Sequence, residues 1–176
     1  MYKRQDKDSA LLREGSIDLS IGVVDASASP ELLTQALFRD RLIGVVRSGH
    51  ALSQGEVSAE RFALGQHVYV SRRGLDRGQV DDALQALGLT REISTIVAGF
   101  ATAIALARDT DLIASVPERY TAHQRDGLYS FALPIVVPPF TVAMLWHPRL
   151  DADVAHRWLR GCLRQVCGQQ VQSPLP

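Results

Sequence analysis

The fold is decided by residues 67–116, which read HVYVSRRGLDRGQVDDALQALGLTREISTIVAGFATAIALARDTDLIASV. A short apolar run, a loop and an amphipathic segment follow one another twice in this stretch. Val80, Ala83, Leu84 and Leu87 recur at the spacing of one helix face. The expected elements are strands at 67–71, 93–97 and 111–116 and helices at 79–87 and 100–108. Because a connecting helix lets successive strands run parallel, this order predicts a parallel α/β sheet.

Shorter elements flank this segment on both sides. We expect a helix that ends at Gly15, strands at 17–24 and 37–47, a loop at 25–30, a bend at 48–50, a short helix at 58–63 capped by Ser58, an extended connector at 134–139 and a strand at 140–146. The bend and the proline-rich connector bracket a self-contained middle segment. This arrangement is typical of a two-lobed protein with two crossovers.

The C-terminal region predicts one amphipathic helix that Asp151 caps. Its apolar stripe consists of Val154, Trp158, Cys162 and Val166. A second stripe holds Arg157, Arg160 and Arg164 and is expected to be a solvated face rather than a DNA contact. Trp146 and Trp158 are expected in the core.

Composition and charge limit the functions that the chain can perform alone. The 19 lysines and arginines balance 19 aspartates and glutamates, so the chain is a poor candidate for binding nucleic acid alone, which needs a cationic face. Cys162 and Cys167 are the only cysteines, and they imply neither a disulfide framework nor a metal site. The N-terminus resembles no signal peptide and no window reaches membrane-spanning length, so we expect a cytoplasmic protein without membrane contact.

Three segments resemble the effector-binding domains of LysR-type transcriptional regulators. LLREGSIDLSIG at 11–22 resembles their helix and strand, and residues 37–52, ending VVRSGHAL, resemble their next strand and first crossover. Alanine at position 51 stands where the family more often has proline. WHPRLDADVAHRWLR at 146–160 is similar to the ending of the subgroup that contains nodulation and aromatic-degradation regulators.

The resemblance implies a periplasmic-binding-protein-like (type 2) α/β fold with two Rossmann-like lobes joined by two crossovers. We expect an incomplete, apparently truncated lobe I at 6–47 and 140–168, lobe II at 50–134, foreign or disordered residues at 1–5 and a disordered tail at 169–176. It also implies a small-molecule effector, a homo-oligomer, and DNA contact only through an N-terminal domain that is absent from this chain.

The expected effector site lies in the cleft between the lobes, where strands end and helix N-termini present donors. The loop after residue 71 offers a hydroxyl, backbone amides and arginines for a carboxylate or phenolate. A second helix N-terminus lies beside an aromatic ring, and lobe I adds a strand end. The expected effector-binding residues are Ser71, Arg72, Arg73, Gly74, Gly99, Phe100, Ala101, Thr102, Gly22 and Val23. The same residues are also compatible with solvated turns and a core phenylalanine.

No catalytic set, metal site or cofactor is expected. The five histidines are scattered, Ser71 lacks the setting of a nucleophile elbow, and Gly74 and Gly78 lack the residues of a phosphate loop. The alternatives are a solute-binding protein of a transport system, a small α/β enzyme and a truncated fragment without independent function.

Overall fold

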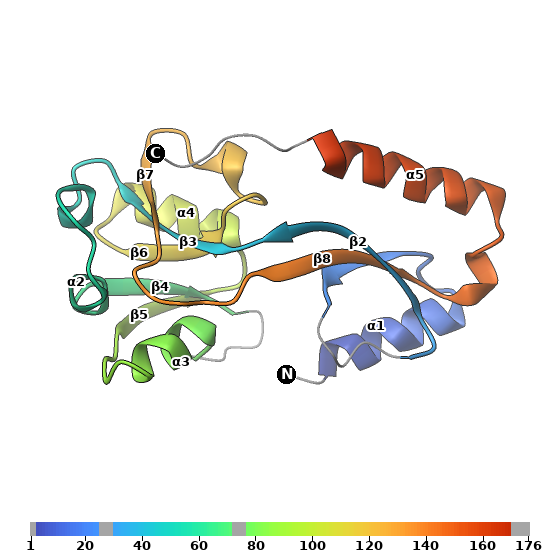
Figure 1. Cartoon of the computed structure of the whole chain (residues 1–176), viewed down its shortest axis with the longest axis horizontal. Helices are drawn as coiled ribbons and strands as arrows, with labels where there is room; N and C mark the ends of the chain where they lie inside the picture. The colour runs from blue at the N-terminus through green and yellow to red at the C-terminus, as the bar shows by residue number, and fades with distance from the viewer. Residues whose placement is uncertain (1–2, 25–29, 72–76, 170–176) are drawn as a thin grey trace. The chain divides into compact units, whose positions relative to one another are not determined.

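The computed structural model describes residues 3–24, 30–71 and 77–169. Residues 25–29 of the expected loop, residues 1–2 of the expected segment 1–5 and residues 170–176 of the expected tail 169–176 therefore lie outside the described residues, whereas Gln169 ends the last helix. The chain divides into two compact units. Among the described residues, unit 1 holds those up to Asp40 and those from Phe140 to Gln169, and unit 2 holds Arg41–Pro139. Each unit has its own sheet (Figure 1).

Unit 2 is built on a five-stranded sheet with the order β5-β4-β6-β3-β7. The strands are β3 (Leu42–Arg47), β4 (Gln66–Val70), β5 (Glu92–Val97), β6 (Ile113–Pro117) and β7 (Leu128–Ala132). The helices are α2 (Ala59–Ala63), α3 (Gln79–Gln85) and α4 (Phe100–Asp109), with 3-10 turns η1 (Ala51–Ser53) and η2 (Ala122–Gln124). β4 runs parallel to both β5 and β6, so the predicted parallel order is confirmed. β3 is antiparallel to β6 and β7.

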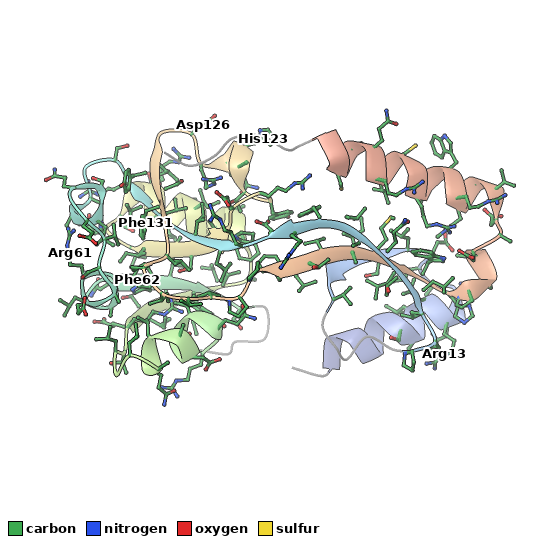
Figure 2. All side chains as sticks on the ribbon, in the orientation of Figure 1. Arg13, Arg61, Phe62, His123, Asp126 and Phe131 are labelled. Atoms are coloured by element: carbon green, nitrogen blue, oxygen red, sulfur yellow. The ribbon has the colours of Figure 1, made fainter. Side chains whose placement is uncertain are left out.

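Helices cover both faces of this sheet. Val46 and Ile113 face α2 and α3 and share a cluster with Phe62 and Phe131, whose ring centroids lie 6.3 Å apart (Figure 2). Neighbouring residues point to opposite sides of a strand, so Val45 faces α4 instead. The predicted cap of the short helix is confirmed, because the Ser58 hydroxyl accepts a hydrogen bond from the backbone N–H of Arg61 at 3.3 Å.

Unit 1 contains a three-stranded antiparallel sheet with the order β1-β8-β2. Its strands are β1 (Ser20–Val23), β2 (Leu33–Asp40) and β8 (Phe140–Trp146), and its helices are α1 (Lys3–Glu14) and α5 (Val154–Gln169), with a 3-10 turn η3 (Pro148–Leu150). Figure 1 shows α1 and α5 on either side of this sheet. Gly15 ends α1 with a φ of 80°, which glycine adopts without strain. Leu12 of α1 packs with Leu145 of β8.

The strand predicted at 37–47 is in fact two strands that belong to different sheets. Asp40 ends β2 opposite Phe140, whereas Leu42 begins β3 opposite Pro117. The sequence does not indicate the break between the two strands at Arg41, because no glycine or proline lies beside it. Residues 41–47, expected in lobe I, therefore lie in unit 2, and the first crossover precedes the bend at 48–50.

The other boundaries differ less from those that the sequence predicts. Phe140 begins the return to unit 1 directly after the proline-rich connector. Lys3–Gln5 form the first turn of α1, although 1–5 were expected to be foreign or disordered.

The last helix differs from the prediction in its cap and in its buried face. α5 begins at Val154, and the Asp153 carboxylate accepts the backbone N–H of His156 at 2.7 Å. Asp153 therefore caps the helix in place of Asp151, which ends η3.

The apolar stripe of α5 faces outward. Val154 is 73% exposed, Trp158 70% and Val166 59%, so the expectation of a core Trp158 is wrong. Trp146 is buried as expected. Arg160 is also buried, so the arginine stripe is solvated only in part.

No helix among the described residues is long and apolar enough to cross a membrane. In the same part of the chain, no group of three or more histidine, cysteine, aspartate or glutamate side chains could hold a metal ion.

Candidate functional site

The carboxyl ends of β4, β5 and β6 meet at one edge of the unit 2 sheet, because these strands are parallel. Ser71 follows β4 there, and its backbone N–H donates to the carbonyl of Val97 at the end of β5. Gly99 lies two residues after the end of β5, and Glu118 follows β6 directly. Ligands of open α/β sheets bind at such an edge, which makes it the candidate functional site.

The N-terminus of α4 opens at this edge. Gly99 precedes the helix with an extended backbone and, having no side chain, leaves the first turn without a side-chain cap. Ala101 and Thr102 of that turn are exposed, and the turn carries no acidic residue. The first backbone N–H groups of a helix have no intrahelical acceptor, and the helix dipole makes them attractive to anions. The edge can therefore receive a carboxylate or phenolate oxygen.

An aromatic pair lies beside this helix end. The ring of Phe100 meets the ring of Tyr120 in an edge-to-face arrangement, with 6.1 Å between the centroids. Tyr120 is 64% exposed, whereas Phe100 is partly buried against the cluster under α4. Sequence reasoning missed Tyr120. The available signal was its position three residues after Pro117, at the end of the third strand of the parallel set.

An ion pair flanks the same edge. Arg41 contacts Glu118 through two hydrogen bonds, Nε to Oε2 at 2.5 Å and Nη2 to Oε1 at 3.1 Å. The backbone N–H of Glu118 donates to the carbonyl of Arg41 at 2.9 Å. Because Arg41 binds both carboxylate oxygens of Glu118, the negative charge of this glutamate is neutralised. The remaining attraction for an anion comes from the helix end.

Five of the expected site residues meet at this edge, namely Ser71, Gly99, Phe100, Ala101 and Thr102. Arg72, Arg73 and Gly74 lie outside the described residues. Gly22 and Val23 belong to β1 of unit 1, opposite Ala143 and Val142 of β8.

A buried polar network supports the segment that leads from β4 into α3. Arg91 holds the Asp81 carboxylate with two hydrogen bonds, at 2.7 and 3.0 Å, and its side chain is only 1% exposed. Asp81 in turn accepts the backbone N–H of Gly78 at 2.8 Å. The Tyr69 hydroxyl donates to the carbonyl of Arg77. These contacts fix the start of α3 against β4 and β5.

His67 lies beneath this network as a neutral side chain. It is completely buried, its Nε2 lies 2.9 Å from the Phe62 carbonyl, and Arg91 approaches its Nδ1 at 3.4 Å. Burial, followed by the charge of Arg91, lowers the pKa of His67 to about 4. Burial acts to raise the pKa of Asp81, but the hydrogen bonds and charge of Arg91 lower it below the usual value.

A hollow of about 300 Å³ lies between α3 and β5, lined by Arg77, Asp81, Gln85, Arg91 and Ile96 among others. The carboxylate of Asp81 is already bound to Arg91 there. The Asp81 carboxylate and the Arg91 guanidinium are therefore already paired with each other in this hollow.

Comparison with known proteins places this fold in a family. The family model of the LysR substrate binding domain matches residues 5–168. The chain is 30% identical over 155 residues to the HTH-type transcriptional activator NahR of Pseudomonas putida, covering 85% of this chain and 50% of NahR. It is 35% identical over 155 residues to the HTH-type transcriptional regulator SyrM of Rhizobium meliloti, covering 86% and 47%. The chain thus spans about half the length of these relatives.

A solved structure shows the same architecture. The regulatory domain of MexT, a transcriptional activator in Pseudomonas aeruginosa, superposes with a TM-score of 0.72 at 25% identity, covering 89% of this chain and 76% of that domain. The expected α/β, periplasmic-binding-protein-like (type 2) fold is therefore confirmed.

Proposed function

Since the chain belongs to the LysR substrate binding domain family, we propose that it senses a small organic effector at the carboxyl edge of β4, β5 and β6. The observation that carries the proposal is the end of α4, where exposed first-turn residues lie beside the Phe100 and Tyr120 rings. Backbone donors suit an oxyanion and the rings suit an apolar or aromatic body. The effector is therefore an organic carboxylate or phenol.

Binding at this edge controls transcription through a difference in affinity. An effector shifts an equilibrium between two arrangements only by as much as it binds one of them better. We propose no catalytic role for the chain. Contact with DNA is assigned to the part of the HTH-type regulators that this chain does not span, because the chain covers only about half of their length. The proposed compartment is the cytoplasm, where transcriptional regulators act.

A thermal-shift screen with Thr102→Asp tests this site. An effector present at about 100 times its dissociation constant adds roughly 2.7 kcal/mol of apparent stability to the wild-type chain. Aspartate at position 102 repels an anion, yet it suits the first turn of a helix, so the free variant melts no lower than the wild type. We expect small aromatic and aliphatic carboxylates and phenols that raise the wild-type midpoint to lose this effect in the variant.

Thr102→Val is the matched control, because it removes the hydroxyl without adding charge. We expect it to keep most of the shift. A ligand that stabilises Thr102→Asp as strongly as the wild type would place the effector away from the end of α4.

The outward apolar stripe of α5 supports a homo-oligomer. Trp158 and its stripe neighbours Val154 and Val166 expose large apolar side chains on one helix face, and such patches mark contact surfaces. We expect Trp158→Glu to shift the sedimentation profile toward the monomer, while Arg157→Glu on the neighbouring polar face leaves it unchanged. If the wild-type chain sediments as a monomer at 100 µM, roughly the scale of weak association, the stripe does not join two copies.

A further inference from the structure

A hollow of about 400 Å³ lies beside α5 in unit 1. Arg157, Arg160 and Arg164 line it from the helix, and Thr34 and Gln35 line it from β2. The three arginines are spaced three and four residues apart, so they lie on one side of α5. β2 is an edge strand of its sheet. The hollow therefore has one strongly basic wall and one neutral polar wall.

The central arginine is held in place by the protein itself. Arg160 donates to the carbonyls of Leu150 and Asp151, at 3.3 and 3.0 Å, and lies 2.6 Å from Nδ1 of His156. Its guanidinium also stacks over the ring of Trp146 at 4.4 Å. Its side chain is 9% exposed. Arg160 is thus a fixed positive charge at the base of the hollow.

The one carboxylate that lines the hollow is already engaged. Oδ1 of Asp151 accepts the indole N–H of Trp146 at 3.1 Å and a guanidinium N–H of Arg160 at 3.3 Å. Asp151 therefore balances Arg160 and contributes little toward the other two arginines.

Arg157 and Arg164 carry the charge that remains. Both are exposed at the rim, and neither guanidinium has a hydrogen-bond or ion-pair partner among the residues that the structure describes. Three positive charges against one negative charge leave the hollow with a net charge of about +2. Each guanidinium presents five N–H donors in a fork that fits carboxylate and phosphate oxygens.

We propose that this hollow is a second binding site, for a small polyanion that carries carboxylate or phosphate groups. Arg157 and Arg164 lie seven residues apart, about 10 Å along the helix axis. A ligand with more than one negative charge engages both guanidinium groups, whereas a singly charged one engages them less well. Thr34 and Gln35 of β2 supply the opposite, uncharged wall. Every lining residue belongs to unit 1, so the site is separate from the effector edge in unit 2 and does not depend on the proposed function.

The test is titration calorimetry of the full 176-residue chain with inorganic phosphate and with citrate, at constant ionic strength set by sodium chloride. We expect saturable binding of at least one of the two, and the tighter one identifies phosphate or carboxylate as the preferred chemistry. Loss of one charged hydrogen-bonding group weakens binding by about tenfold or more, so we expect this effect in both Arg157→Gln and Arg164→Gln.

Arg39→Gln is the matched control, because it removes one exposed positive charge from β2 outside the hollow. We expect its dissociation constants to stay within about twofold of the wild type. Thr102→Asp, at the effector edge, also leaves this binding intact. Circular dichroism melts confirm that the compared variants are folded.

Four results would overturn the proposal. The first is the absence of saturable binding of both phosphate and citrate. The second is unchanged binding in Arg157→Gln and Arg164→Gln. The third is equal weakening in Arg39→Gln, which would identify a general charge effect. Binding that Thr102→Asp abolishes and Arg164→Gln retains would also contradict it, because the anion would then bind at the end of α4.

Discussion

Replacement of Arg91 by methionine is expected to lower the free energy of unfolding by about 3 kcal/mol. The change leaves the Asp81 carboxylate, only 13% exposed, without its two guanidinium hydrogen bonds. A buried charge without its partner costs far more than the net value of the intact pair. Denaturant unfolding of the wild type and the variant measures the difference.

A double variant separates this charge effect from lost packing. Asp81→Asn keeps an oxygen for the Gly78 N–H and removes the charge, so Arg91→Met combined with Asp81→Asn is expected to be more stable than Arg91→Met alone. Arg47→Met is the exposed counterpart, because Arg47 pairs with an Asp111 that is 72% exposed. Its expected cost is below about 1 kcal/mol. Equal losses in Arg91→Met and Arg47→Met would contradict the structural role of the buried pair.

Acidification is expected to destabilise the chain through His67. The pKa of His67 is about 4 in the folded chain, below its usual 6.5, so the unfolded state takes up the proton first. The contribution of the neutral, buried His67 to the free energy of unfolding is fully present above about pH 6.5. It is lost as the pH falls toward 4, and the total loss is roughly 3 kcal/mol.

Unfolding free energies measured between pH 7.5 and 4.5 test this prediction. His67→Gln removes the titrating group, so its stability should fall less steeply over this interval than that of the wild type. His123→Gln is the control, because His123 is exposed on η2. Parallel curves for the wild type and His67→Gln would show that the buried imidazole does not control the acid response.

The middle of the chain was predictable because local signals there agree with the tertiary structure. Val80 and Leu84 fall on one helix face and are buried, as their spacing indicates. Gly88, expected to close a helix at 79–87, adopts a φ of 71° three residues after α3 ends at Gln85. The parallel order follows from the alternation of strands and helices, and the sequence therefore also located the edge that carries Ser71 and Phe100.

The missed features depend on contacts between residues far apart in sequence. Arg41 separates two strands because its neighbours pair with different partners, Phe140 and Pro117, and no local residue signals this. Strand β7 was missed because it depends on pairing with β3, which is far away in the sequence. Tyr120 was missed because its ring contact with Phe100 spans two different strand ends.

In α5 the apolar periodicity of the sequence does not predict which face of the helix is buried. A stripe of Val154 and Trp158 predicts a buried face, yet the side that packs inward carries His156 and Arg160. Arg160 is buried because Trp146, Asp151 and two backbone carbonyls surround its guanidinium. The spacing of apolar residues cannot predict these partners of Arg160, because they come from other parts of the sequence.

The transport and enzyme alternatives are not favoured. The relatives that cover most of the chain are transcriptional regulators, and the match to the substrate binding domain extends over residues 5–168.

The most direct test of the effector site is an amide chemical-shift titration of the isotope-labelled chain with a ligand selected by the thermal-shift screen. We expect the largest changes at Ser71, Phe100, Ala101 and Thr102, with smaller changes in the hollow between α3 and β5. Changes that concentrate on Gln85 and Arg91 while the first turn of α4 stays unperturbed would contradict it, and would place the effector in that hollow instead.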